Sequence, residues 1–162
     1  MSNIILTNKY YFAIISLIFF LDRISKLIIL KISEPTGDLN IIFNSFINFN
    51  LVWNRGIGFG FFSFHDQLYY NVLTLIIIII TLVIAWLMVV SQNYDKFGYS
   101  LIAGGSLGNI FDRIFYSSVV DFIDIHINNH HWFIFNIADV FITLGIIILI
   151  YSEIKEKKYK NE

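Results

Sequence analysis

Long apolar stretches alternate with shorter polar segments along this chain. The apolar stretches run from about residue 10 to 30, 69 to 90, 98 to 115 and 133 to 151. Each has about 18 to 22 residues, close to the roughly 20 that an α-helix needs to cross the hydrocarbon core of a bilayer. The pattern therefore predicts an all-α membrane protein with four transmembrane helices in a single domain, 1–162.

Charged residues within these stretches are few. The first stretch is interrupted by Asp22, Arg23 and Lys26, whereas the second contains no charge. The third becomes polar near Asp112, and the fourth contains a single charge, Asp139. Because the first stretch is too long and too charged for a cleaved signal peptide, we expect it to remain as a helix. A carboxylate in or beside a bilayer is costly, so these aspartates are candidate functional residues.

Two long connections, about 31–68 and 116–132, separate the apolar stretches. In the first connection, residues 47–51 alternate apolar and polar side chains, which is the period of a half-buried strand. A glycine-rich segment follows and leads into several phenylalanines. We expect a small β-sheet on the outer membrane face and a mobile loop, 54–64, that covers the site. An ordinary hairpin with interfacial aromatic residues is the alternative.

The basic residues indicate an orientation. One side holds Lys9, Lys96, Lys155, Lys157, Lys158 and Lys160. The other side holds Lys31 and Arg55, with Arg23, Lys26 and Arg113 near its membrane edge. Because cytoplasmic segments are enriched in lysine and arginine, we expect both termini in the cytoplasm and both long connections outside.

Composition supports the membrane assignment and excludes other classes. The chain is 57% hydrophobic and its mean hydropathy is +0.70, which would make a soluble domain hard to keep dispersed. A net charge of −1 gives no basic patch for nucleic acid. The chain contains no cysteine, so it has neither disulfides nor a thiol nucleophile.

Polar residues gather at the outer ends of three of the predicted helices. Asp22 and Lys26 are four residues apart on one helix face, where they could form a structural ion pair or hold a loop or substrate. The other two groups are also spaced to share a face: Asn109 with Asp112 and Arg113, and Asn136 with Asp139. Three such groups at one depth are best explained by a single site inside the bundle.

Asp121 and Asp139 fall where the third and fourth apolar segments reach the same side of the membrane. Two converging carboxylates in a site of low dielectric share one proton, because both cannot be ionised. One then serves as a base and the other as an acid, as in aspartic peptidases. This chemistry needs neither a metal nor an organic cofactor.

The sequence contains residues for two other catalytic arrangements, a serine nucleophile and a metal site. Residues 104–108, G-G-S-L-G, match the serine nucleophile pattern at Ser106, but no predicted span contains the histidine base that it needs. A metal site could be imagined from Asp124, His126, His130 and His131. There is no H-E-x-x-H motif, so surface histidines are the favoured interpretation.

Five short motifs occur in order along the predicted spans. They are D-R-I-S-K from Asp22 to Lys26, N-R-G-I-G-F-G from Asn54 to Gly60, G-G-S-L-G-N-I-F-D-R from Gly104 to Arg113, V-D-F around Asp121 and F-N-I-A-D ending at Asp139. Together, over nearly the whole chain, they resemble the lipoprotein signal peptidases (signal peptidase II) of bacterial inner membranes. Ile57 and Gly58 stand where alanines are common in that family, which leaves the packing of the loop open.

The resemblance implies an aspartic endopeptidase that removes signal peptides from diacylglyceryl-modified prolipoproteins, cleaving just before the lipidated cysteine. Asp121 and Asp139 would be its catalytic pair. The residues that would shape the site or contact substrate are Asn54, Gly56, Asn109, Asp112, Arg113 and Asn136, supported by Asp22 and Lys26. The implied partners are lipid-modified prolipoproteins and membrane lipid, and nucleic acid is not among them. We expect a monomer in the inner membrane, with its site at the periplasmic face.

Two alternatives from other classes stay open at this point. A small proton-coupled or ion-coupled transporter would also contain intramembrane acids, although here they gather at one face and no inverted repeat is visible. A non-catalytic membrane subunit could use the same polar ends to bind a partner. Cleavage of a lipidated prolipoprotein peptide in vitro would distinguish the peptidase from both.

Overall fold

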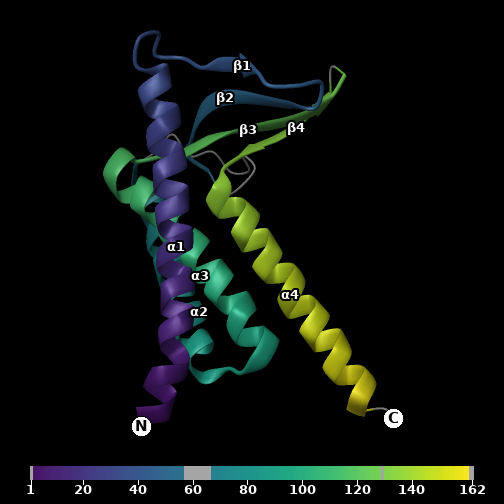
Figure 1. Cartoon of the computed structure of the whole chain (residues 1–162). Helices are drawn as coiled ribbons and strands as arrows, with labels where there is room; N and C mark the ends of the chain where they lie inside the picture. Colours follow the sequence, from purple (N-terminus) through teal and green to yellow (C-terminus); the bar gives the residue numbers. More distant parts are fainter. Residues whose placement is uncertain (1, 57–66, 129, 161–162) are drawn as a thin grey trace.

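The computed structural model describes residues 2–56, 67–128 and 130–160. In these residues the elements are α1 (Ser2–Ser33), β1 (Asn40–Ile42), β2 (Ile47–Asn54), α2 (Gln67–Val90), α3 (Asn93–Tyr116), β3 (Val119–Ile127), β4 (His130–Phe135) and α4 (Ile137–Lys160). The helices form a bundle with the sheet across one end (Figure 1). The start of α1 and the end of α4 both lie at the opposite end, on separate sides of the bundle.

Helix α3 packs against each of the other three helices. Its glycines allow this close approach. A Cβ atom added to Gly105 would lie 2.5 Å from the Ala138 carbonyl oxygen in α4, and one added to Gly104 would lie 2.9 Å from the Cβ of Ile18 in α1. Small residues at such contacts let helix backbones meet at short range in membranes. The glycine motif of α3 is therefore a packing surface for its neighbours.

Helix α2 contains five consecutive isoleucines, 76–80, a composition that in water favours a strand. In a bilayer the backbone must satisfy its own hydrogen bonds, so such a segment folds as a helix. The buried threonine hydroxyls of α2 also form their hydrogen bonds within the helix. Thr74 donates to the Tyr70 carbonyl at 2.9 Å, and Thr81 donates to the Ile77 carbonyl at 2.8 Å.

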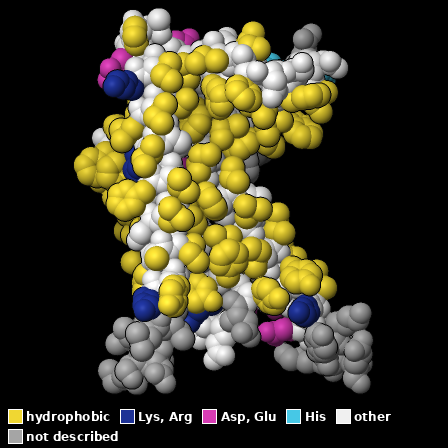
Figure 2. Space-filling view, in the orientation of Figure 1, with side chains coloured by type: hydrophobic (Ala, Val, Ile, Leu, Met, Phe, Trp, Pro, Cys, Tyr) yellow, Lys and Arg dark blue, Asp and Glu magenta, His cyan; other side chains and the backbone are white. Residues whose placement is uncertain are grey.

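The outer surface of the helices is apolar. Two helical segments of the described chain, Gln67–Val90 and Ile137–Lys157, are long and apolar enough to cross a membrane. Helices α1 and α3 hold more charges, which their buried faces bring together. Hydrophobic side chains also cover most of the visible helix surface (Figure 2). Leu17, Phe20, Ile79 and Ile147 are examples of helix residues that are about half exposed. An apolar surface of this extent is typical of a protein that faces lipid.

The sheet is antiparallel, with strand order β1-β2-β3-β4. The pairing of β2 with β3 joins the two long outer connections, and it places Val52 opposite Asp121. An apolar cluster formed by Ile29, Leu39 and Phe122 packs the sheet against the outer end of α1. The sheet therefore fixes β3 over the outer end of the bundle.

Two sequence predictions about the elements differ from the structure. The fourth apolar stretch was predicted to span from residue 133, but α4 begins at Ile137 because 130–135 pair with β3 as a strand. The second connection, 116–132, was not predicted to contain strands, yet it supplies all of β3 and the first half of β4. The strand predicted at 47–51 is confirmed within β2. Most of the predicted loop 54–64 lies outside the described residues.

Candidate active site

The two candidate catalytic carboxylates come from different elements. Asp121 lies in β3, and Asp139 lies in the first turn of α4. Asn136 links them, because its side-chain nitrogen donates to Asp121 Oδ1 at 2.6 Å and its backbone nitrogen donates to Asp139 Oδ2 at 3.2 Å. The structure therefore brings this sequence-predicted pair to one place.

The start of α4 explains why Asp139 is held there. The Asn136 side chain accepts a hydrogen bond from the Asp139 backbone nitrogen at 3.1 Å, and Asp139 accepts one from the Asn136 backbone nitrogen. Asn136 directly precedes the helix, so this reciprocal pair is a capping box in which an aspartate takes the usual place of glutamate. The N-x-x-D spacing that starts the helix therefore also places a carboxylate in the site.

Amide side chains surround both carboxylates. Asn54 donates to Asp121 Oδ2 at 2.9 Å, and Asn109 donates to Asp139 Oδ1 at 2.9 Å. Asn136 also donates to Asn109 Oδ1 at 3.1 Å, which completes a chain of amides around the pair. These neutral donors orient the carboxylates without placing a full positive charge against either of them.

The electrostatics of Asp121 differ from those of a surface carboxylate. Its residue is only 2% exposed. Burial, followed by repulsion from the Asp139 carboxylate, raises the pKa of Asp121 from 3.8 to about 7, although hydrogen bonds from Asn54 and Asn136 favour its ionised form. A carboxyl group that holds its proton near neutral pH can act as a general acid there.

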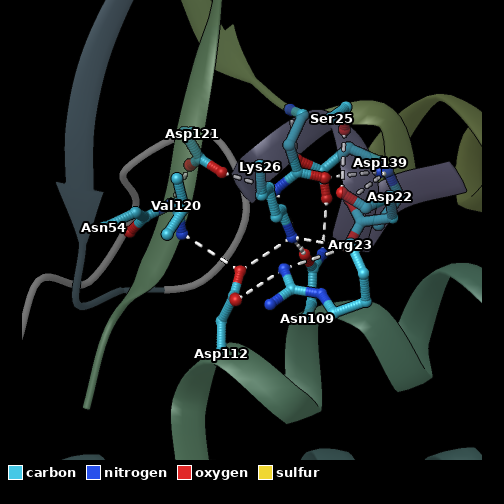
Figure 3. Close-up of polar contacts among 12 residues, drawn as sticks. Asp22, Arg23, Ser25, Lys26, Asn54, Asn109, Asp112, Val120, Asp121 and Asp139 are labelled. Atoms are coloured by element: carbon cyan, nitrogen blue, oxygen red, sulfur yellow. Dashed lines mark hydrogen bonds and ion pairs between the residues drawn. The ribbon is translucent and has the colours of Figure 1, made fainter. Parts of the chain in front are cut away.

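A buried network of ion pairs lies beneath the pair (Figure 3). Lys26 Nζ lies 2.8 Å from Asp22 and 2.7 Å from Asp112, and Arg23 lies 2.6 Å from Asp112. These four side chains are nearly or fully inaccessible to solvent. Two acids and two bases therefore balance within the outer end of the α1–α3 contact, as buried charges require.

This network also holds the backbone next to each carboxylate of the pair. Asp112 accepts a hydrogen bond from the Val120 nitrogen at 3.2 Å, and Asp22 accepts one from the Ala138 nitrogen at 3.1 Å. Val120 and Ala138 directly precede Asp121 and Asp139. Since Lys26 bridges both acids, one buried cation connects the supports of the two catalytic elements (Figure 3).

Lys26 and Arg113 extend the network to Asn109 and to the end of β2. Lys26 donates to Asn109 Oδ1 at 2.9 Å. Arg113 donates to the Gly56 carbonyl, and the Gly56 nitrogen donates to Asn54 at 2.8 Å. Every site residue expected from the sequence is thus part of one connected cluster. Arg23 also belongs to it, and sequence reasoning missed it as a site residue even though it is a charge inside an apolar stretch.

A cavity of about 240 Å³ opens beside the pair between α2, α3 and α4. Asp121 and Asp139 line it together with Asn54, Asn109 and Arg113 at the polar end. Ile77, Ile142 and Ile146 line the rest, and Ile146 is also exposed on the outer surface of α4. The cavity therefore offers an apolar approach from the lipid side and a polar end that contains two carboxylates.

The geometry does not support a serine nucleophile or a catalytic metal site in the cavity. Ser106 lines the same cavity, but none of the described residues that line it is a histidine. His126 and His131 instead lie in β3 and β4. The carboxylate pair is thus the acid–base unit that the described part of the cavity presents.

Comparisons with known proteins agree with one another. A family model described as "Signal peptidase (SPase) II" matches residues 14–155. A lipoprotein signal peptidase of Pelagibacter ubique is 43% identical over 155 residues, covering 95% of this chain and 93% of the relative. One from Thermodesulfovibrio yellowstonii is 39% identical over 145 residues, covering 88% of this chain and 92% of the relative.

Solved structures are similar as well. Two structures described as bacterial membrane enzymes superpose with TM-scores of 0.75 and 0.69 at 26% and 28% sequence identity. The first superposition includes 93% of this chain and 91% of the solved chain. The second includes 90% of this chain and 93% of the solved chain. With the family match over most of its length and the carboxylate pair at the outer end of the bundle, this chain belongs to the signal peptidase II family of membrane peptidases.

Proposed function

We propose that this chain is an aspartic endopeptidase that removes signal peptides from diacylglyceryl-modified bacterial prolipoproteins, cleaving just before the lipidated cysteine. Asp121 and Asp139 are its catalytic residues. The observation that supports this most strongly is the buried carboxylate pair bridged by Asn136 at the polar end of a lipid-facing cavity. The relatives named lipoprotein signal peptidase supply the substrate class.

The chemistry follows from one proton shared by two carboxyl groups. The ionised carboxylate takes a proton from a water molecule as the water oxygen bonds to the peptide carbonyl carbon. The protonated carboxyl group donates its proton to the carbonyl oxygen, which gives a tetrahedral diol. Collapse of the diol breaks the carbon–nitrogen bond, and a proton passes to the leaving nitrogen. The raised pKa of Asp121 makes one protonated carboxyl available near neutral pH.

The cavity fits a substrate that stays in the membrane. Its apolar wall of Ile77, Ile142 and Ile146 can contact the hydrophobic part of a signal peptide. Acyl chains on the adjoining cysteine can remain in lipid, since withdrawing them would cost about 0.8 kcal/mol for each buried CH₂ group. The scissile peptide then lies at the polar end, beside the carboxylate pair.

We also propose a topology with four transmembrane helices and both termini in the cytoplasm of a bacterial inner membrane. In this topology the sheet and the catalytic pair face the periplasm, and the protein works as a monomer. The helix ends opposite the sheet contain Lys9, Lys96, Lys155 and Lys157, in agreement with the enrichment of basic residues in cytoplasmic segments.

The direct test is cleavage of a synthetic diacylglyceryl-modified prolipoprotein peptide by the purified full chain in detergent. Asp121→Asn and Asp139→Asn should each lower kcat by about 10²–10⁴-fold or more, because an amide of the same size cannot exchange the proton. The matched control is Asp38→Asn, which changes an exposed carboxylate at the same end of the molecule and should leave turnover unchanged. Near-normal turnover by either catalytic variant would refute the aspartic mechanism.

A further inference from the structure

A second polar cluster lies in the sheet, away from the cavity. Asp124 and His126 are two residues apart in β3, and His131 in β4 is the register partner of His126. Residues two apart on a strand share a face, and register partners lie side by side on it. One possible ligand atom from each of these residues lies within 4.8 Å of the other two. The imidazole rings of His126 and His131 have centroids 5.1 Å apart.

Hydrogen bonds within the protein leave this cluster partly unsatisfied. Asp124 is 1% exposed, and its Oδ1 atom has no hydrogen-bond partner among the residues that the structure describes. The Nδ1 atom of His126 is also buried, and no described residue hydrogen-bonds to it. A buried carboxylate oxygen that receives no donor is costly, so the site is incomplete as a purely hydrogen-bonded structure. Each of these two atoms can donate an electron pair to a cation.

The other carboxylate oxygen is held in position. Asp124 Oδ2 accepts a hydrogen bond from Asn50 Nδ2 at 2.7 Å and lies 2.7 Å from His131 Nδ1. Asn50 belongs to β2, so a third strand fixes the orientation of the carboxylate. Such outer hydrogen bonds orient ligating side chains in metal sites. A hydrogen bond between Asp124 and His131 alone would account for the position of Asp124 Oδ2 and of the His131 ring. It would not account for the buried Asp124 Oδ1 or for the buried nitrogen of His126.

We propose that Asp124, His126 and His131 bind one divalent transition-metal ion of the zinc type. Two imidazoles and one carboxylate are ligands that suit Zn²⁺, whereas Mg²⁺ and Ca²⁺ prefer oxygen alone. Zinc holds such ligands at about 2.0–2.2 Å. The His131 side chain is half exposed, so its ring has room to reorient toward the ion. Water completes the coordination from the open side.

The bound ion links β3 to β4 beside an irregularity in their pairing, between Asp124 and His126. Three residues earlier, the same strand contains Asp121. The ion therefore stabilises the hairpin that follows a catalytic strand, and it takes no part in the proposed hydrolysis. Binding can be measured without peptide cleavage, so failure of this inference and failure of the proposed function are distinguishable.

The test is titration of the purified full chain, without a histidine tag, with Zn²⁺ in calorimetry and with Co²⁺ followed by its visible absorption. One ion per chain should bind saturably. His126→Gln and His131→Gln should each weaken binding by at least about tenfold, and Asn50→Ala should weaken it by about 10–100-fold, as loss of an outer hydrogen bond does. The matched control is His130→Gln, an exposed histidine in the same strand, which should leave the affinity unchanged.

Two results would overturn the proposal. One is the absence of saturable Zn²⁺ binding at one ion per chain. The other is binding by the His126→Gln and His131→Gln variants that matches the unmodified protein, or an equal loss in His130→Gln, which would assign the ion to other surface histidines. Because His131 is half exposed, its replacement keeps the fold, and elution of each variant as a monodisperse peak checks this.

Discussion

Lys26 is the buried cation that joins the two buried acids of the site. It pairs with Asp22 and Asp112 and donates to Asn109. The methylenes of a lysine add apolar packing, but its charge is what balances two buried acids. Its removal would leave Arg23 as the cation beside both acids, at 2.6 Å from Asp112 and at the longer distance of 3.4 Å from Asp22.

Lys26→Met tests this balance. We expect a loss of roughly 3–5 kcal/mol of stability, the usual cost of removing one partner from a buried pair. Lys157→Met is the matched control, because Lys157 pairs with Glu153 at the same i,i+4 spacing but on the exposed surface. Its cost should be no more than about 0.5 kcal/mol. Equal melting temperatures for the two variants in detergent would contradict the supporting role of Lys26.

The raised pKa of Asp121 predicts a pH dependence. Below about pH 7 the folded carboxyl group keeps its proton, so kcat/KM should fall about tenfold per pH unit above that value as the proton is lost. The free energy of unfolding should also depend on pH, in a direction that follows from the same pKa. In the unfolded chain the group ionises near 3.8, so the folded state binds more protons between about pH 4 and 7, and stability should decrease as pH rises through this window.

Cleavage rates and melting temperatures between pH 5 and 9 check both expectations. Asp121→Asn removes the titrating group, so its melting temperature should vary less across pH 5 to 8 than that of the unmodified chain. A cleavage rate that stays constant up to pH 9 would contradict a protonated Asp121 in the reaction.

At the scale of the elements, the contact between α3 and α4 sets the position of Asp139. Gly105 touches the Ala138 carbonyl, so α4 begins directly against α3. The buried Ala138 nitrogen is held by Asp22 from α1 at the same point. Three helices therefore meet within one residue of a catalytic carboxylate.

Gly105→Ala should separate α3 from α4, because backbone atoms at 2.5 Å from the new Cβ cannot turn aside. We expect a lower melting temperature, with a cost of about 1–3 kcal/mol as for overpacking elsewhere, and a lower kcat. Leu107→Ala is the control on the same helix, since Leu107 is 41% exposed to the lipid side. If Gly105→Ala matches the unmodified chain in both measurements, α3 and α4 tolerate separation and the close contact does not position Asp139.

Much of this arrangement could be predicted from the sequence, and the reasons are local. Asp22 and Lys26 had to share a helix face, and Asn136 and Asp139 had to share a helix start. The β3–β4 hairpin was missed even though residues 123–127, I-D-I-H-I, alternate apolar and polar side chains, because the apolar pair Val119–Val120 and the run from Phe122 to Ile123 interrupt that alternation earlier in the strand. The pairing of β2 with β3 joins residues about 70 positions apart, and no local pattern specifies such a partner. The unpartnered atoms of Asp124 and His126 became visible only through that pairing.

At the scale of the whole molecule, the sheet and the lysine-rich helix ends define two opposite faces. We expect the sheet to be outside and the turn between α2 and α3 to be inside. Single cysteines are informative because the chain has none of its own. In intact cells, Asn128→Cys should react with a membrane-impermeant thiol reagent, whereas Gln92→Cys should react only after the membrane is opened. Both positions are exposed, and the reverse labelling pattern would invert the topology and move the proposed site to the cytoplasm.

The strand pairing between β2 and β3 has a consequence for the time at which the enzyme becomes active. The first half of the chain supplies Asp22, Lys26 and Asn54, and the second half supplies both catalytic carboxylates. Asn136 directly precedes α4 and Asp139 lies in its first turn, so the second carboxylate follows α1, α2 and α3 along the chain. Neither half contains a complete site, so we expect a chain that has not yet formed α4 to be inactive. In the proposed function, hydrolysis would therefore begin only once α4 docks against the other three helices.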